Sequence, residues 1–268
     1  MGARGTWTQA GSKAVANHKP TALNRNAARS APFAVCVNGC ICTVTCAVTL
    51  ALLALSAAGC GPRPAGHTQL VASTGPAGAT LFRLDADATQ IWLLLQADGP
   101  LARIGHNHVI STHGLQGSVW LHPQLERSSC ALQLPVAAFV VDDPQERAAA
   151  GGDYAEPLDA DARTGTRAHM LGDRQLDATQ FPLVSLQCRR LTAAVDGVTV
   201  ELQVTLRGRE SQLTVPVKWQ RVGTVLRASG EFSFRQTAVG LEPYSLLFGA
   251  LRVSDEIRVR YQLLARAS

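Results

Sequence analysis

The chain has 268 residues, and 25 Lys and Arg against 20 Asp and Glu give it a formal net charge of +5. This excess belongs to the amino-terminal segment, because five of the cations lie within the first 30 residues and no acidic residue precedes Asp85. The remaining residues are balanced in charge, so they offer no basic face of the kind that nucleic-acid binding requires. We therefore expect no nucleic-acid partner, and the length suits one domain with additional segments.

An apolar run over residues 41–58 follows the basic segment and leads directly into Gly59 and Cys60. A basic region, an apolar region and small residues before a cleavage point are the parts of a secretory signal. Small residues directly before a Cys also resemble the bacterial lipobox, in which the Cys is acylated and becomes the new amino terminus. We expect residues 1–59 to be a signal segment with a long basic n-region, and Cys60 to be the lipidation site. An uncleaved membrane anchor and ordinary cleavage are the alternatives, since about 18 apolar residues come close to spanning a bilayer.

Residues 60–79 are rich in Gly, Pro and Ala, and we interpret them as the lipidated Cys followed by a flexible tether. A lipoprotein or an anchored protein would hold a domain at residues 80–268 on the periplasmic side of a bacterial membrane. Gly61 stands where an Asp commonly signals retention in the inner membrane, which favours the outer membrane.

Alternation of apolar and polar residues is the clearest pattern in the chain. It recurs in four segments, at 200–206, 213–219, 226–235 and 257–263. A period of two predicts strands with one dry and one wet face, and short connections predict an antiparallel sheet. A curved sheet of this kind encloses either its own side chains or a ligand.

The preceding residues predict further strands and a helical excursion. We expect one strand within 109–122 and a long strand at 128–141 with a bulge at Pro135. The polar segment 142–177 fits a helix start within 157–170 and a second short helix near Gly172, and 237–250 fits a loop or short helix. Other short strands are expected at 81–85, 90–97 and 182–188. Together these elements predict an all-β fold, an antiparallel barrel of about eight strands with a short helical insertion.

Cys130 and Cys188 are the only cysteines that follow Cys60. Cys130 opens one predicted strand and Cys188 closes another, and both share the apolar parity of their strands. If these strands pair antiparallel, the two thiols lie at the same end and form a disulfide in an oxidising compartment. Two buried free thiols are the alternative.

His106 and His108 lie two residues apart and share one face of a strand. Two imidazoles at that spacing can bind one metal ion, with His113 as a third ligand. Alternatively these histidines lie at a barrel rim, where they bond loop backbone or the polar head of a ligand. No Cys or carboxylate cluster lies nearby in the sequence, and we predict no metal and no cofactor.

Motifs for catalysis are missing from the sequence. We find no Gly-x-Ser-x-Gly elbow and no evident Ser-His-Asp arrangement. Glycine-rich phosphate loops are also absent. We therefore predict a protein that is not an enzyme and has no catalytic residues.

Several short segments, taken in order, resemble the YceI-like family of periplasmic proteins. They include RIGHNHVI at 103–110, GTRAHMLGDRQLD at 165–177, TLRGRESQLTVP at 205–216 and FGALRVSD at 248–255. The resemblance runs from Leu81 to Ala265. It implies an extended lipocalin-like antiparallel barrel with a helical insertion, which holds a long polyisoprenoid chain in its interior.

The inward parity of the strands predicts which side chains would line the barrel. A filled barrel would use the same residues as plain core. The predicted lining residues are Leu132, Leu134, Val184, Leu186, Val204, Leu206, Val215, Val217, Phe232, Phe234, Ile257 and Val259.

The most specific function that this reasoning supports is non-enzymatic binding or carriage of an isoprenoid or similar amphiphile outside the cytoplasm. The membrane partner would be reached through the lipid anchor, and the sequence leaves the oligomeric state open. One alternative is a periplasmic metal- or haem-linked accessory protein that uses His106 and His108. Another is a ligand-free structural or interaction barrel.

Overall fold

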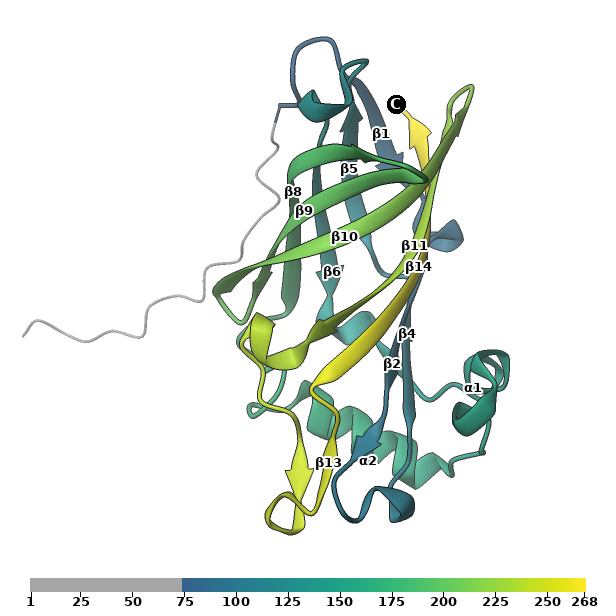
Figure 1. Cartoon of the computed structure of the whole chain (residues 1–268), viewed down its shortest axis with the longest axis vertical. Coiled ribbons are helices and arrows are strands. Elements are labelled where there is room, and N and C mark those ends of the chain that lie inside the picture. Colours follow the sequence, from purple (N-terminus) through teal and green to yellow (C-terminus); the bar gives the residue numbers. More distant parts are fainter. Residues whose placement is uncertain (1–73) are drawn as a thin grey trace, which may run out of the picture. The chain divides into compact units, whose positions relative to one another are not determined.

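Antiparallel strands form a closed barrel in the computed structural model, which describes residues 74–268 (Figure 1). The predicted signal segment at 1–59, the lipidation site Cys60 and most of the tether lie outside the described residues. The barrel strands are β1 (Thr80–Leu84), β5 (Gln116–Leu121), β6 (Ser129–Pro135), β8 (Leu183–Ala194), β9 (Gly197–Leu206), β10 (Arg209–Val222), β11 (Val225–Arg235) and β14 (Glu256–Ala267).

Closure comes from the pairing of the last strand with the first. The eight strands follow one another in the order just given, and β14 then pairs antiparallel with β1, where Phe82 faces Ala267. A closed ladder satisfies backbone groups that an open sheet would leave at its edges. The predicted lipocalin-like antiparallel barrel of about eight strands is therefore confirmed.

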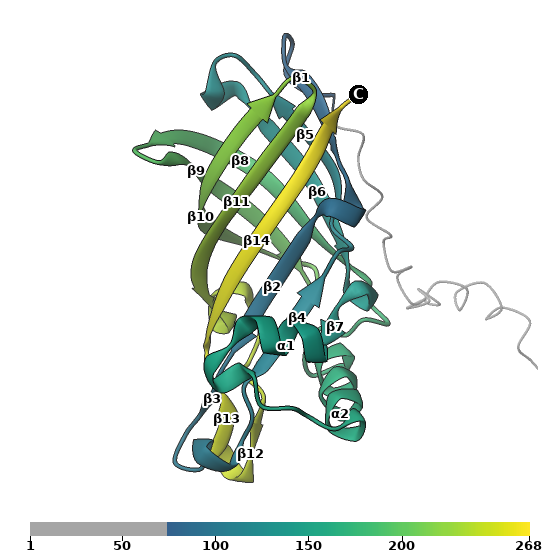
Figure 2. The same cartoon turned by 90° about the vertical axis from the view of Figure 1, so that its right-hand side faces the viewer.

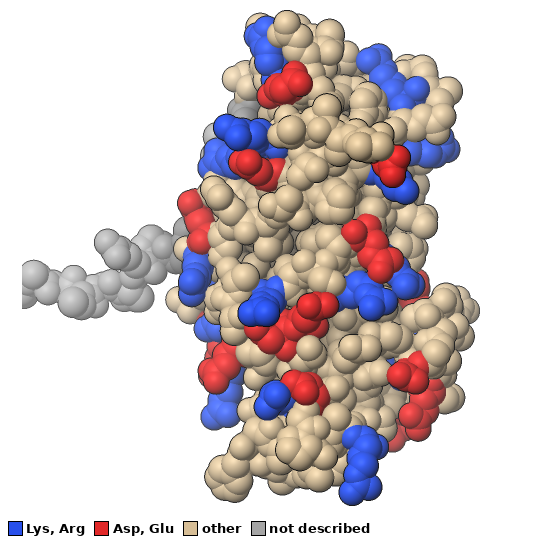
Figure 3. All heavy atoms as spheres, viewed as in Figure 1, with Lys and Arg blue, Asp and Glu red and all other residues tan. Residues whose placement is uncertain are grey.

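Alternation in the sequence becomes an inner and an outer face. On β9, Val198, Val200, Val204 and Leu206 are buried, in agreement with the period of two. The outer face carries charged side chains of both signs (Figure 3), with ion pairs such as Arg260 to Glu231 at 2.9 Å. The alternating pattern therefore places the apolar faces of the strands around one interior and the charged faces on the outside.

Two of the predicted strands are divided in the structure. The segment 109–122 contains β4 (His108–Thr112) and β5, because the Thr112 hydroxyl accepts a hydrogen bond from the Gly114 amide at 3.0 Å and forms a turn. The segment 128–141 contains β6, a 3₁₀ turn at Val136–Ala138 and β7 (Val140–Val141). The prediction of one strand in each segment was wrong.

The fold has two levels: the closed eight-stranded barrel, and a lower level of shorter strands that continues the sheet from β14. Along one edge of β14, β1 pairs with its carboxyl-terminal end and β2 (Gln90–Leu95) with the preceding residues. Strands β4 and β7 continue the sheet from β2. A separate small sheet consists of β3 (Ala97–Asp98), β12 (Ser245–Leu246) and β13 (Leu251–Val253). Figure 2 shows this sheet at the lower end of the molecule, below β2 and β4.

Two α-helices lie beside this lower level (Figure 2). Helix α1 (Pro144–Ala150) was not predicted, although the Asp143 carboxylate caps it by accepting from the Gln145 and Glu146 amides. Helix α2 (Ala160–Leu171) packs against β7 and is capped by Asp159. Gly172 ends α2 and does not begin the predicted second helix. In the described part of the chain no helix is long and apolar enough to span a bilayer.

Short 3₁₀ turns connect several of these elements. The first five lie before α2, and the last two flank β12. They are η1 (Ala86–Ala88), η2 (Ala102–Ile104), η3 (Leu125–Arg127), η4 (Val136–Ala138), η5 (Gly152–Tyr154), η6 (Gln236–Val239) and η7 (Leu247–Gly249).

Candidate functional site

The interior of the barrel holds a cavity of about 730 Å³. This volume lies within the range of small-molecule binding sites, roughly 300–1,000 Å³. Its wall extends from Leu121 and Leu191 to Ala162 on α2 and Leu251 on β13. All twelve side chains that the sequence predicted as lining lie on this wall: Leu132, Leu134, Val184, Leu186, Val204, Leu206, Val215, Val217, Phe232, Phe234, Ile257 and Val259.

The wall is almost entirely apolar. In the part of the chain that the structure describes, no Asp or Glu lines the cavity, and Arg252 is its one Lys or Arg. The Arg252 guanidinium is paired with Asp98, with Nη2 and Oδ2 2.8 Å apart. Because a charge without a partner is costly in apolar surroundings, the wall suits a ligand that is apolar over most of its length.

A disulfide joins two of the wall strands. Cys130 on β6 and Cys188 on β8 face each other directly in the ladder, and their sulfur atoms are 2.01 Å apart. Both residues line the cavity. The structure thus brings together the two cysteines that the parity of their strands placed at the same end.

Polar side chains of the wall gather at the helical end of the cavity. His106 and His108 lie there at the start of β4, and His169 reaches the wall from α2. The His169 ring packs against Tyr244, with ring centroids 4.9 Å apart. This end of the cavity can therefore hydrogen-bond the head of a ligand whose tail lies among the aliphatic side chains.

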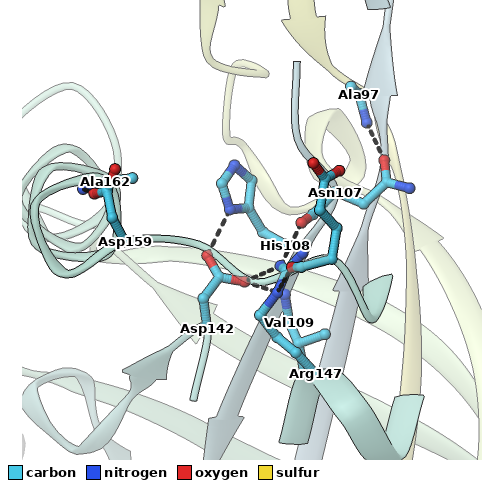
Figure 4. Close-up of polar contacts among 9 residues, drawn as sticks. Ala97, Asn107, His108, Val109, Asp142, Arg147, Asp159 and Ala162 are labelled. Atoms are coloured by element: carbon cyan, nitrogen blue, oxygen red, sulfur yellow. Dashed lines mark hydrogen bonds and ion pairs between the residues drawn. The ribbon is translucent and has the colours of Figure 1, made fainter. Parts of the chain in front are cut away.

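His108 is held by a buried carboxylate that sequence reasoning did not single out (Figure 4). Its Nδ1 lies 2.6 Å from Oδ2 of Asp142, a fully buried residue with φ of 52°. The other ring nitrogen of His108 points away from Asp142 (Figure 4). With a carboxylate at Nδ1, a neutral His108 carries its proton there and presents Nε2 as an acceptor.

The second carboxylate oxygen of Asp142 is also satisfied. Oδ1 accepts from the Val109 amide at 2.8 Å and from Nη1 of Arg147 at 2.7 Å. Arg147 is buried, and it also donates to the carbonyl oxygens of Asn107 and Glu156. This network fixes the loop before β4 against α1, which positions the His108 ring.

Electrostatics at Asp142 favour its charged form. Burial alone would raise the pKa of the Asp142 carboxyl. The hydrogen bond and charge of His108, the Val109 amide and the Arg147 guanidinium outweigh burial and hold the pKa of Asp142 below its usual value. Asp142 is therefore an anion that orients His108 and neutralises Arg147.

The three histidines of the metal hypothesis are not all brought together. His113 is exposed in the turn between β4 and β5 and does not line the cavity, whereas His106 and His108 do. Across residues 74–268, no group of three or more His, Cys, Asp and Glu side chains is placed to hold a metal ion.

The family model of the YceI-like domain matches residues 83–265. The chain belongs to the YceI-like family. This family consists of ligand-binding barrels that are known for binding hydrophobic molecules. The hollow, apolar barrel described above is therefore the fold of this family.

Two solved structures of bacterial proteins are similar to this chain. The crystal structure of Burkholderia cenocepacia BcnA is 15% identical, has a TM-score of 0.51, and covers 68% of this chain and 98% of its own. A Campylobacter jejuni YCEI protein is 9% identical with a TM-score of 0.44, and covers 59% of this chain and 84% of its own. At 15% identity the likeness to BcnA concerns the fold alone. A search of curated proteins gave no match to this sequence.

Proposed function

We propose that this YceI-like barrel binds or carries a long apolar lipid, an isoprenoid or similar amphiphile, without chemical conversion. The observation that carries the proposal is the cavity of about 730 Å³, whose wall is aliphatic and aromatic along the barrel and polar at one end. Removing the lipid chain from water stabilises the complex by about 0.8 kcal/mol for each buried CH₂ group. The twelve lining residues supply the apolar contacts.

Two features favour a head group that is neutral and forms hydrogen bonds. The wall's one guanidinium, on Arg252, is already paired with Asp98, so it is not a free partner for a phosphate. His108, His169 and Tyr244 offer hydrogen-bonding groups at the same end. A hydroxyl or carbonyl head therefore fits these residues better than a charged one.

Native mass spectrometry of the protein, purified without detergent, tests the proposal. We expect a species heavier than the chain by one lipid, and uptake of an isoprenoid quinone by protein that has been stripped of lipid. A protein that emerges empty and takes up no quinone or prenol would count against lipid binding.

The role of His108 can be tested by His108→Asn. The Asn amide keeps a donor close to the position of Nδ1, beside Asp142, but removes Nε2 from the cavity. Loss of one hydrogen bond to the ligand predicts an affinity for an isoprenoid quinone lower by about three- to tenfold. His113→Asn is the matched control, because His113 is exposed and does not line the cavity, and it should leave the affinity unchanged. Equal affinities in both variants would remove His108 from the ligand site.

We also propose that the barrel works on the periplasmic side of a membrane, tethered through acylated Cys60. The support is the signal-like segment at 1–59 and the Cys130–Cys188 disulfide, since disulfides persist in oxidising compartments. In cells fed a labelled fatty acid, the wild type should become labelled and fractionate with membranes, and Cys60→Ser should not be labelled. Equal labelling of both proteins would contradict acylation at Cys60.

A further inference from the structure

An exposed apolar tip stands beside the polar end of the cavity. Leu246 ends β12, and Leu247 and Phe248 follow it in the turn that leads to β13. The exposed fractions of these three residues are 47%, 60% and 113%. Ile104, from the loop after β3, is also 58% exposed. We call these four residues the apolar tip. Figure 3 shows the lower left end of the molecule, where this hairpin lies in Figure 1, without charged side chains at its extremity.

The two loops of the apolar tip are fixed to one another. β13 pairs with β3, and the Leu101 amide donates to the carbonyl oxygen of Ala250 at 2.9 Å. Gly99 lies so close to Ala250 that a Cβ on it would be 2.6 Å from that carbonyl oxygen. The apolar side chains are thus presented by an ordered support.

The backbone of the turn is costly for these residue types. Leu247 and Phe248 have φ of 51° and 56°, in the left-handed region that favours Gly, Asn or Asp. Phe248 gains no burial within the chain in return, because its side chain is fully exposed. Strained backbone that presents apolar groups to solvent points to a function for the turn.

The position of the apolar tip connects it to the ligand cavity. Ile104 and Leu246 belong both to the tip and to the cavity wall. Arg103, the residue before Ile104, is exposed and forms no ion pair within residues 74–268. Apolar side chains beside a free cation are the composition of a segment that enters the interface of a membrane.

We propose that the apolar tip docks into a lipid bilayer, so that the polar end of the cavity faces the membrane from which a ligand is loaded. A bilayer suits this surface better than a protein does. A stable protein interface buries about 1,000 Å² or more, whereas four side chains on a projecting turn are enough to enter the acyl boundary. The loading role rests on the proposed lipid-binding function, but the membrane contact does not.

Membrane contact is tested by fluorescence quenching with the full chain. Phe248→Trp and Val222→Trp place a new Trp at the apolar tip and at the β10–β11 hairpin. Val222 is also exposed, at the end of β10, and this hairpin lies at the opposite end of the molecule from β13 (Figure 1). The four native Trp residues are the same in both proteins. With vesicles of phosphatidylethanolamine and phosphatidylglycerol that carry brominated acyl chains, we expect added quenching in Phe248→Trp only. No added quenching, or equal quenching in both variants, overturns the proposal, and the first result favours a protein partner.

Loading is tested by the rate at which the lipid-free full chain takes up an isoprenoid quinone from the same vesicles. We expect Leu247→Ser with Phe248→Ser to slow uptake by at least about tenfold, because two large apolar side chains are lost from the interface. The amount bound at equilibrium should stay the same. Val195→Ser with Val222→Ser removes two exposed apolar residues at the other end and should not slow uptake.

The outcomes separate the two proposals. Equal uptake rates in the tip and control variants would overturn the loading role. A barrel that takes up no quinone in any variant would instead reject the proposed ligand, and the quenching experiment would still decide whether the tip enters the bilayer.

Discussion

Leu186→Trp is expected to produce a folded barrel that carries no lipid. Leu186 on β8 faces Leu132 on β6 and Val204 on β9, and all three side chains line the cavity. A Trp side chain at this level projects into the space that the lipid chain would occupy. We expect lipid occupancy in native mass spectra to fall by at least about tenfold. The Trp side chain takes the space of several CH₂ groups of the lipid, and each CH₂ group that is no longer buried costs about 0.8 kcal/mol of binding free energy.

The hollow interior is the reason to expect that this variant folds. In a filled core, added volume costs about 1–3 kcal/mol, whereas here the larger ring enters free space. Gln187→Trp is the matched control, since Gln187 is the next residue on β8 and is exposed on the outer face. Equal amounts of lipid in the two variants would show that the lipid binds elsewhere, and equal loss in both would show that the effect is not obstruction of the cavity.

Asp142→Ala is expected to destabilise the domain by about 3–5 kcal/mol, because it leaves Arg147 as a buried charge without its partner. The guanidinium would keep its bonds to two carbonyl oxygens but lose its only anion among the described residues. The Val109 amide and His108 would also lose their acceptor. Urea unfolding at pH 7 measures the change, and Asp143→Ala is the control, since Asp143 caps α1 from a half-buried position and pairs with no buried cation among the described residues. Similar losses in the two variants would contradict the central role of Asp142.

The same carboxyl predicts a dependence of stability on pH. Its folded-state pKa lies below the unfolded value of about 3.9, so Asp142 contributes stability above that pH. The contribution is lost as the pH falls through the lower, folded-state pKa. The difference in unfolding free energy between wild type and Asp142→Asn should therefore shrink as the pH falls below about 4. A difference that grows in this acidic range would contradict the assignment.

The sequence was most informative where strands are long and regular. The alternation at 200–206, 213–219, 226–235 and 257–263 gave four strands that the structure contains as β9, β10, β11 and β14, and it assigned the inward side chains. Closure of the barrel follows from the number of strands and from the family resemblance. No local sequence pattern indicates that β14 pairs with β1, which lies more than 170 residues away in the chain.

Local chemistry explains the boundaries that were missed. The breaks at Thr112 and after Pro135 depend on turns that a hydrophobic pattern does not record. Helix α1 carried a readable signal, Asp143 followed by Pro144, but it is too short for a periodicity of 3.6 to appear. His108 and Asp142 are 34 residues apart in the sequence and meet only when β4 pairs with β7 and brings the following loop close. The sequence therefore indicated His108 as a candidate but not the carboxylate that it contacts.

One wall of the cavity differs from the rest in how it is attached. The strands are joined by backbone ladders, but none of the backbone hydrogen bonds in residues 74–268 joins α2 to a strand. The side chain of Arg167 makes one bond to the carbonyl oxygen of Ala137, and no residue of α2 is fully buried. The backbone bonds at the end of α2 go to the loop that follows it, at Leu176 and Ala178. The helical end of the cavity is therefore attached to the barrel by side-chain contacts, which are weaker than the backbone ladders that join the eight strands.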